Sequence, residues 1–249
     1  MDPDGRGGYR GWSQRLAERI AGAQGGLRYA NLAVRGTTTR EIRERQLERA
    51  VAMRPDLATV FSGTNDVMRA RFDRGAFAAD ALALQRALRA GGATVLTFTL
   101  PDLSPLLPLA RLFARRIRDM NAAVRAACAE TGTRLVDFAA WPVATDERLW
   151  NPDRIHANAA GHARIADALA DALGLAGASG AWRDPLPVQP RRPLAASVAR
   201  ELDWAARTLL PACAGAVVPR RWRGARARAS VALPGKRPEL APVELPHQQ

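Results

Sequence analysis

The chain has 249 residues, of which 47% are hydrophobic and 24% charged, and its formal net charge is +13. The apolar content excludes a wholly disordered chain, and no apolar run reaches the roughly 18 residues of a membrane-spanning helix. Two cysteines, Cys128 and Cys213, are too few for a disulfide framework or a zinc site. The polar N-terminus has no apolar signal segment, so the sequence predicts a cytoplasmic protein.

The positive charge is unevenly distributed. Residues 180–249 hold 12 basic and 5 acidic side chains, a net charge of +7, against +6 for residues 1–179. Every basic side chain except Lys236 is arginine. An arginine bias beside abundant alanine is also what GC-rich coding produces, so the charge is weak evidence for a polyanion, and nucleic acid is not an expected partner.

Up to about residue 175, short apolar runs alternate with amphipathic helical patterns. The expected strands lie at 27–34, 57–61, 94–100 and 134–138. The expected helices lie at 10–23, 39–53, 74–91, 107–131 and 159–174. Nearly continuous apolar strands are typical of a parallel sheet that is covered on both faces. The order predicts an α/β fold, a doubly wound, flavodoxin-like parallel sheet in three layers with helices on both faces.

The remaining residues have a different texture. Ten of the 17 prolines lie in residues 180–249, and one helix is expected there, at about 193–210. From Arg220 onward no periodicity is visible, which predicts irregular structure. We therefore expect a domain over residues 1–175 and a basic Pro/Arg-rich extension over 176–249.

Candidate functional residues follow the strands, because ligands of parallel α/β sheets bind beyond the carboxyl ends of the strands. Gly36 opens a turn into a helix, where backbone N–H groups can face an anion. Thr38-Thr-Arg-Glu41 has the spacing of a capping box at the start of that helix. Asn65 offers a neutral amide donor suited to an oxyanion. Asp153 and His156 are three residues apart, a spacing that lets the carboxylate reach Nδ1 of the imidazole and orient a general base.

In combination, three blocks resemble the SGNH hydrolases, or GDSL esterases/lipases. They are Asn31-Leu-Ala-Val-Arg-Gly36, Gly63-Thr-Asn-Asp66 and Asp153-Arg-Ile-His156, the last followed by Asn-Ala-Ala-Gly-His162. The resemblance covers about residues 8–174. It implies His156 and Asp153 as catalytic residues, Gly36 and Asn65 in the oxyanion hole, and no metal or organic cofactor. His162 is expected to pack in the last helix of the domain.

The fourth block of the family, a strand that ends in Gly-Asp-Ser and supplies the serine nucleophile, is absent from this chain. Ser62 and Ser13 are the nearest serines and are not expected to replace it. The missing strand would lie between the first two strands seen here. A start assigned too late is favoured over a truncated gene, because losing an internal strand leaves buried hydrogen bonds unmade at about 1–3 kcal/mol each.

The resemblance implies a serine-type hydrolase of small-molecule acyl esters that is inactive, or nearly so, as written. The alternative is a catalytically dead α/β domain whose basic tail binds a polyanion or a protein partner. Gly235-Lys-Arg-Pro-Glu-Leu240 is similar to C-terminal ends of actinobacterial family members. Trp141 and Trp150 either line the mouth of the site or pack a loop. The acyl and alcohol groups of the substrate and the oligomeric state do not follow from the sequence.

Overall fold

The computed structural model describes residues 10–189, 193–206 and 228–232. Three strands form a parallel sheet in the order β2–β3–β4, and these are β2 (Leu57–Thr59), β3 (Thr94–Phe98) and β4 (Arg134–Val136). The register places Thr59 opposite Leu96, and Leu96 opposite Arg134. The strands expected at 57–61, 94–100 and 134–138 are therefore confirmed, each two residues shorter than the apolar run that predicts it.

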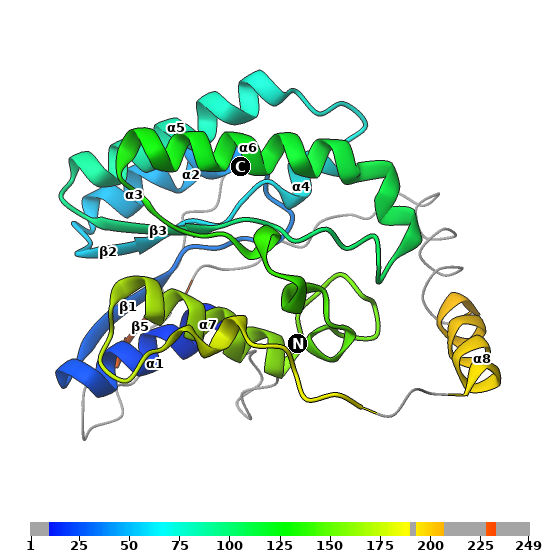
Figure 1. The fold of residues 1–249 in the computed structure, drawn as a ribbon. Coiled ribbons are helices and arrows are strands. Elements are labelled where there is room, and N and C mark those ends of the chain that lie inside the picture. The colour runs from blue at the N-terminus through cyan, green and yellow to red at the C-terminus, as the bar shows by residue number, and fades with distance from the viewer. Residues whose placement is uncertain (1–9, 190–192, 207–227, 233–249) are drawn as a thin grey trace.

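Helices cover both faces of this sheet, so the three layers expected from the sequence are present (Figure 1). One face carries α2 (Thr39–Arg45), α3 (Leu47–Ala52), α5 (Arg74–Ala90) and α6 (Ala114–Thr131). The other face carries α1 (Trp12–Gln24) and α7 (Ala159–Leu173). Buried residues recur along these helices at helical spacing, as in Phe77, Ala81, Leu84 and Leu88 of α5.

Two expected helices differ in detail from the structure. The helix expected over 39–53 is divided into α2 and α3, because the backbone at Gln46 leaves helical geometry, with φ −121°. The helix expected over 107–131 begins with a 3₁₀ turn, η1 (Pro108–Phe113), before α6. The capping box is confirmed: the Thr38 hydroxyl accepts from the Glu41 N–H, and the Glu41 carboxylate accepts from the Thr38 N–H at 2.7 Å.

The first expected strand lies outside the parallel sheet. It forms β1 (Leu27–Asn31), which pairs antiparallel with β5 (Arg228–Ala232). The interpretation of residues from 220 onward as irregular is therefore wrong for β5, a short segment whose pairing depends on a distant partner. Within the described residues β1 and β2 share no ladder, and the edge of β2 turned away from β3 carries no strand.

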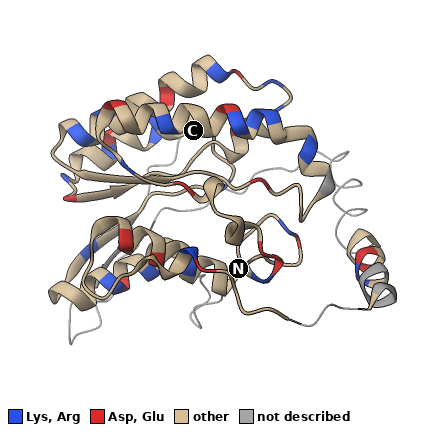
Figure 2. Ribbon diagram, in the orientation of Figure 1, with Lys and Arg blue, Asp and Glu red and all other residues tan. Residues whose placement is uncertain are grey.

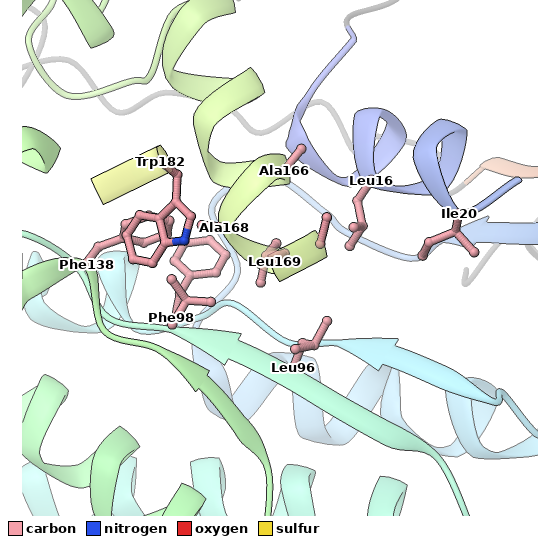
Figure 3. Close-up of a cluster of buried hydrophobic side chains, with 11 residues drawn as sticks. Leu16, Ile20, Leu96, Phe98, Phe138, Ala166, Ala168, Leu169 and Trp182 are labelled. Atoms are coloured by element: carbon pink, nitrogen blue, oxygen red, sulfur yellow. The ribbon is translucent and has the colours of Figure 1, made fainter. Parts of the chain in front are cut away.

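The largest buried cluster lies between the sheet and the pair α1 and α7 (Figure 3). Leu96 and Phe98 point to it from β3, and Leu169 of α7 is fully buried in it. Phe98 stacks on Phe61 with ring centroids 4.1 Å apart. Trp182, beyond the expected boundary at 175, packs edge-on against Phe138 at 5.3 Å and is 5% exposed. The start of the extension thus contributes to the core of the preceding domain.

Short helical turns and one further helix complete the described chain. The turns are α4 (Thr64–Val67), η2 (Phe138–Ala140), η3 (Pro142–Thr145), η4 (Glu147–Leu149) and η5 (Gly180–Arg183). The helix expected at about 193–210 is confirmed as α8 (Leu194–Trp204), which lies beyond the carboxyl ends of the parallel strands (Figure 1). No helix in the described ranges is long and apolar enough to cross a membrane. Cys213 and the 235–240 segment lie outside the described residues.

Candidate functional site

The turn at Gly36 is fixed by backbone geometry and by the helix that follows it. Gly36 has φ 81°, in the left-handed region that favours glycine. The Thr37 hydroxyl donates to the Val34 carbonyl at 2.8 Å, and Thr38 then caps α2. These contacts therefore fix the direction of the backbone between Gly36 and the start of α2.

Asn65 lies on α4, which is separated from the end of β2 by four residues, and its position depends on Gly63. Gly63 has φ 106°, and a Cβ there would lie 2.4 Å from the Met120 sulfur and 2.9 Å from Phe77. Only glycine allows this close approach of the turn to the core. The Asn65 Nδ2 donates to the Thr37 carbonyl at 2.9 Å, which joins α4 to the Gly36 turn. This contact uses one of the two amide N–H groups of Asn65.

Asp66 strengthens the same junction from the next position along the chain. Its carboxylate accepts the Thr39 N–H at 3.0 Å and the Thr39 hydroxyl at 3.1 Å. Burial raises the pKa of Asp66, while the hydrogen bonds from Thr39 oppose the increase. Asn65 and Asp66 together hold the start of α2 against the end of β2.

Asp153 and His156 form a dyad on the loop before α7. The His156 Nδ1 lies 2.8 Å from the Asp153 Oδ2, the contact that their spacing predicts. Burial opposes ionisation of Asp153, but hydrogen bonds from the His156 ring and from the His156 and Ile155 N–H groups lower its pKa to about 2. The ionised carboxylate therefore favours the imidazole tautomer with the proton on Nδ1. Nε2 is the ring nitrogen that does not contact Asp153, and the His156 side chain is 52% exposed.

Backbone and side-chain hydrogen bonds fix the loop that carries this dyad. The Asn151 N–H donates to the His156 carbonyl at 2.8 Å, and the Asn151 amide donates to the Ala157 carbonyl at 2.9 Å. Asn158 caps α7 by accepting the Gly161 N–H at 3.0 Å. His162, as expected, lies in α7, one turn after this cap.

Trp141 and Trp150 contact other loop residues. Trp150 Nε1 donates to the Ala144 carbonyl at 3.0 Å. Trp141 packs edge-on against Trp182 at 6.0 Å and lies under the Arg183 guanidinium, 5.4 Å from its carbon. Of the two alternatives for these residues, the contacts favour packing of the loop.

Arg154, inside the Asp153–His156 segment, connects the dyad loop to α8. Its backbone has φ 60°, uncommon for a residue with a side chain. Its guanidinium donates to both carboxylate oxygens of Glu201 at 2.7 Å each and to the Leu106 carbonyl at 2.9 Å. It also lies 4.3 Å from the centre of the Trp204 ring. The extension therefore contacts the dyad loop directly, through a side chain that is only 15% exposed.

The structure thus joins the predicted residues into two groups. Asn65 is bonded to the Gly36 turn, and Asp153 is bonded to His156. No hydrogen bond joins one group to the other within the described residues. The serines whose side chains are described make other contacts: Ser13 accepts from Tyr29, Ser62 from Thr39, Ser104 donates to Asp102, and Ser179 caps η5.

Sequence reasoning missed several residues that shape these groups. Asp66, Thr39 and Arg154 lie next to predicted site residues, but their partners are distant in sequence. For Asp66, its place in the Gly-x-Asn-Asp block was a usable signal, whereas nothing local marks Glu201 as the partner of Arg154. Among the described residues no cluster of His, Cys, Asp and Glu could hold a metal ion. Cys128 is buried, and burial raises its pKa to about 11, which is typical of an unreactive thiol.

Comparison with known proteins links this geometry to a family. The model of the GDSL-like lipase/acylhydrolase family matches residues 2–164. The crystal structure of TesA has a TM-score of 0.55 at 24% identity, over 66% of this chain and 87% of that one. Axe2, an acetylxylan esterase from Geobacillus stearothermophilus, has a TM-score of 0.56 at 21% identity, over 69% of this chain and 84% of that one.

A third similar structure is the psychrotrophic esterase EstA from Pseudoalteromonas sp., inhibited by monoethylphosphonate. Its TM-score is 0.54 at 19% identity, over 66% of this chain and 86% of that one. At these identities the likeness establishes the fold, and the family match establishes the class of protein. No curated protein sequence matches the chain.

Proposed function

Because the chain belongs to the GDSL-like lipase/acylhydrolase family, we propose that its site is built for hydrolysis of small acyl esters. The observation that carries the proposal is the 2.8 Å contact between His156 Nδ1 and the Asp153 carboxylate. This contact leaves Nε2 as the atom that accepts a proton from an attacking hydroxyl and returns it to the leaving alcohol.

The other half of the proposed site stabilises developing negative charge. The Gly36 N–H and the second amide N–H of Asn65 are the proposed donors to the tetrahedral oxyanion. Both are neutral donors held in place before the reaction, which is the arrangement that stabilises a transition state at low reorganisation cost. The Asn65–Thr37 hydrogen bond supports this role because it fixes the amide plane beside the Gly36 turn.

The nucleophile limits what this chain does alone. The family uses a serine in a Gly-Asp-Ser block, and the 249 residues contain no such sequence. Ser62 and Ser13 hydrogen-bond to Thr39 and Tyr29, and neither contacts His156. We therefore expect this chain to hydrolyse p-nitrophenyl acetate at a rate close to that of free imidazole.

The test compares the 249-residue chain with a version preceded by a strand ending in Gly-Asp-Ser. A fluorophosphonate probe, with mass spectrometry to locate the adduct, reports an activated serine. We expect labelling and ester hydrolysis only in the longer version, and loss of both in its His156→Ala variant. Equal rates with and without His156 would refute the proposal, as would labelling of Ser62 in the shorter chain.

The second candidate is an α/β domain that binds without catalysis, and the absence of Gly-Asp-Ser favours it. Most of the tail that this alternative invokes lies outside the described residues. In the described part of the extension, two side chains of α8 form ion pairs with the domain: Arg200 pairs with Glu147, and Glu201 pairs with Arg154. Loss of salt-sensitive binding to DNA after deletion of residues 207–249 would support this candidate.

A further inference from the structure

One surface next to the site combines exposed apolar side chains with arginines that form no ion pair within 4 Å in the described part of the chain. It consists of Met68, Leu109 and Leu112 together with Arg71, Arg111, Arg115 and Arg118, and is called the Arg–Leu patch below. Leu112 is 75% exposed, Met68 56% and Leu109 46%. Figure 2 shows basic residues on the first turns of α6 and on the loop that leads into α5.

The geometry of η1 and α6 places these side chains on the outer surface. In a 3₁₀ helix residues three apart eclipse, so Leu109 and Leu112 lie one above the other. Along the same segment Ala110, Ile117 and Met120 are buried in the core. Arg111, Arg115 and Arg118 follow at spacings of four and three residues and are all exposed, so they form a continuous row beside the two leucines.

Arg116 joins the loop after α4, which carries Met68 and Arg71, to α6. Its guanidinium donates to the carbonyls of Val67 at 3.0 Å, Arg69 at 2.6 Å and Ala70 at 3.2 Å. These bonds hold the loop after α4 against the first turn of α6. Met68 and Arg71, both exposed, thereby lie next to the row on η1 and α6.

The charge of the patch is positive, and one carboxylate, that of Asp102, offsets part of it: hydrogen bonds with Ser104 have the largest effect in lowering the pKa of Asp102, and Arg118 and Arg111 lower it further. No carboxylate lies within 4 Å of Arg71, Arg111, Arg115 or Arg118 in the described part of the chain. The acidic neighbours are Asp102, which bonds to Ser104, Asp119, which pairs with Arg74 at 3.8 Å, and Asp73, which caps α5. Four arginines against the single carboxylate that interacts with two of them leave the patch with a net positive charge.

We propose that the Arg–Leu patch docks the protein on an anionic phospholipid bilayer. Arginine side chains are attracted to the negative surface of such a bilayer, and exposed leucine and methionine side chains enter the boundary between head groups and acyl chains. Both the arginine and the apolar side chains are present on one surface, whose two segments are joined by the hydrogen bonds of Arg116. The phosphates of a nucleic acid could pair with the arginines, but Leu109 and Leu112 would stay exposed to water. The exposed leucines therefore favour the bilayer as the partner.

The docked bilayer would face the candidate site. Arg154 donates to the Leu106 carbonyl at 2.9 Å, which ties the dyad loop to the segment leading into η1. Ile155, next to His156 in the dyad loop, is 39% exposed, and Leu202 of α8 is 66% exposed, so further apolar side chains lie exposed on the segments joined by Arg154. This inference rests on surface chemistry and does not require that the site be active.

The test is sedimentation of the full chain with vesicles at about 0.1 M salt, where charges about 10 Å apart still interact. Phosphatidylcholine vesicles are compared with vesicles that contain about one third phosphatidylglycerol. We expect binding to the anionic vesicles only. We expect Leu109→Ser/Leu112→Ser and Arg115→Gln/Arg118→Gln each to reduce the partition coefficient about tenfold or more. All four side chains are exposed, so both variants should fold, which circular dichroism verifies.

Matched controls replace exposed residues of the same kinds at the opposite end of the sheet. Met53→Ser, which changes an apolar side chain that is 42% exposed after α3, and Arg45→Gln on α2 should bind as the unmodified chain does. Binding that both patch variants retain would assign the lipid contact to another surface and overturn the proposal. Absence of binding to anionic vesicles would overturn it as well. If the chain then binds single-stranded DNA and the patch variants lose that binding, the patch would be assigned to nucleic acid.

Discussion

Asn65 and His156 mark two halves of the candidate site, and the contacts that hold them differ. The Gly36–Asp66 half is held from within the domain, through Thr37 and Thr39 at the start of α2. The Asp153–His156 half is exposed and is held in part from outside, through Arg154 and α8. α8 lies beyond residues 2–164, which match the family, so this half is held both by contacts inside the matched residues, such as those of Asn151, and by a contact with the extension. The proposed general base thus lies two residues from a side chain, Arg154, that contacts the extension.

The largest expected effect is on the tautomer of His156. Asp153→Asn keeps an acceptor for the Ile155 and His156 N–H groups but loses the carboxylate that favours the Nδ1 proton. In the version that carries Gly-Asp-Ser we expect kcat for p-nitrophenyl acetate to fall about 10⁴-fold, the loss found when the triad aspartate of a serine protease is replaced. Asp167→Asn on α7 is the control. A loss below tenfold would show that Asp153 has no orienting role.

In the Gly36–Asp66 half the corresponding change is Asn65→Ala, and the expected loss of kcat is smaller than for Asp153→Asn. Removal of one oxyanion donor costs about 10²–10³-fold in kcat, with KM little changed. The Thr37 carbonyl also loses a donor, so thermal unfolding should show a loss of about 1 kcal/mol. Asn151→Ala, which removes a loop amide of the other half, should not lower kcat as far. Equal kcat losses in the two variants would contradict the proposed role of Asn65.

Glu201→Gln tests whether the extension positions the dyad. It weakens the two hydrogen bonds to Arg154 and leaves the core intact. We expect faster hydrogen exchange at the Ile155 and His156 amides and a loss of stability near 1 kcal/mol, as for a partly exposed ion pair. Glu130→Gln, which removes the exposed pair with Arg86, should change neither amide. Unchanged exchange in the Glu201 variant would show that α8 does not hold the loop.

The smallest effect concerns pH, and its sign should differ between the halves. The pKa of Asp153 is lowered to about 2, so its carboxylate stabilises the fold above the unfolded-state pKa, and this contribution is lost as pH falls toward 2. The pKa of Asp66 is raised by burial, so its protonated form is favoured in the fold, and that contribution is lost as pH rises through the raised value.

Melting temperatures across pH measure this difference. The destabilisation caused by Asp153→Asn should shrink between pH 4 and pH 2, about the unfolded and folded values for Asp153. The destabilisation caused by Asp66→Asn should instead grow as the solution is acidified from neutral pH. The same slope in both variants would contradict the assignment of opposite pKa shifts.

Local patterns in the sequence predicted local structure well. The Thr38–Glu41 capping box, the apolar strands and the contact between Asp153 and His156 all depend on residues at most a few positions apart. The single helix predicted over 39–53 is wrong in its length, because nothing in the composition of this segment marks the departure from helical φ at Gln46.

Long-range pairing could not be predicted in the same way. β5 joins β1 across some 200 residues, and its five residues, Arg-Ala-Ser-Val-Ala, contain one β-branched side chain and give a weak strand signal by themselves. Glu201 meets Arg154 across 47 residues, and an ion pair between distant segments leaves no periodicity. The candidate site was therefore predictable as a set of residues, whereas the contact with the extension required the structure.

Among the residues that the structure describes, no strand pairs with the outer edge of β2, and this has a consequence for the behaviour of the protein in solution. Unpaired backbone groups on a strand edge are a template for a second chain, so association should increase with protein concentration. The strand is only three residues long and follows Arg54, Pro55 and Asp56, which bring charge and a residue without an N–H donor to its beginning. Light scattering should accordingly detect weak, reversible self-association in place of irreversible aggregation.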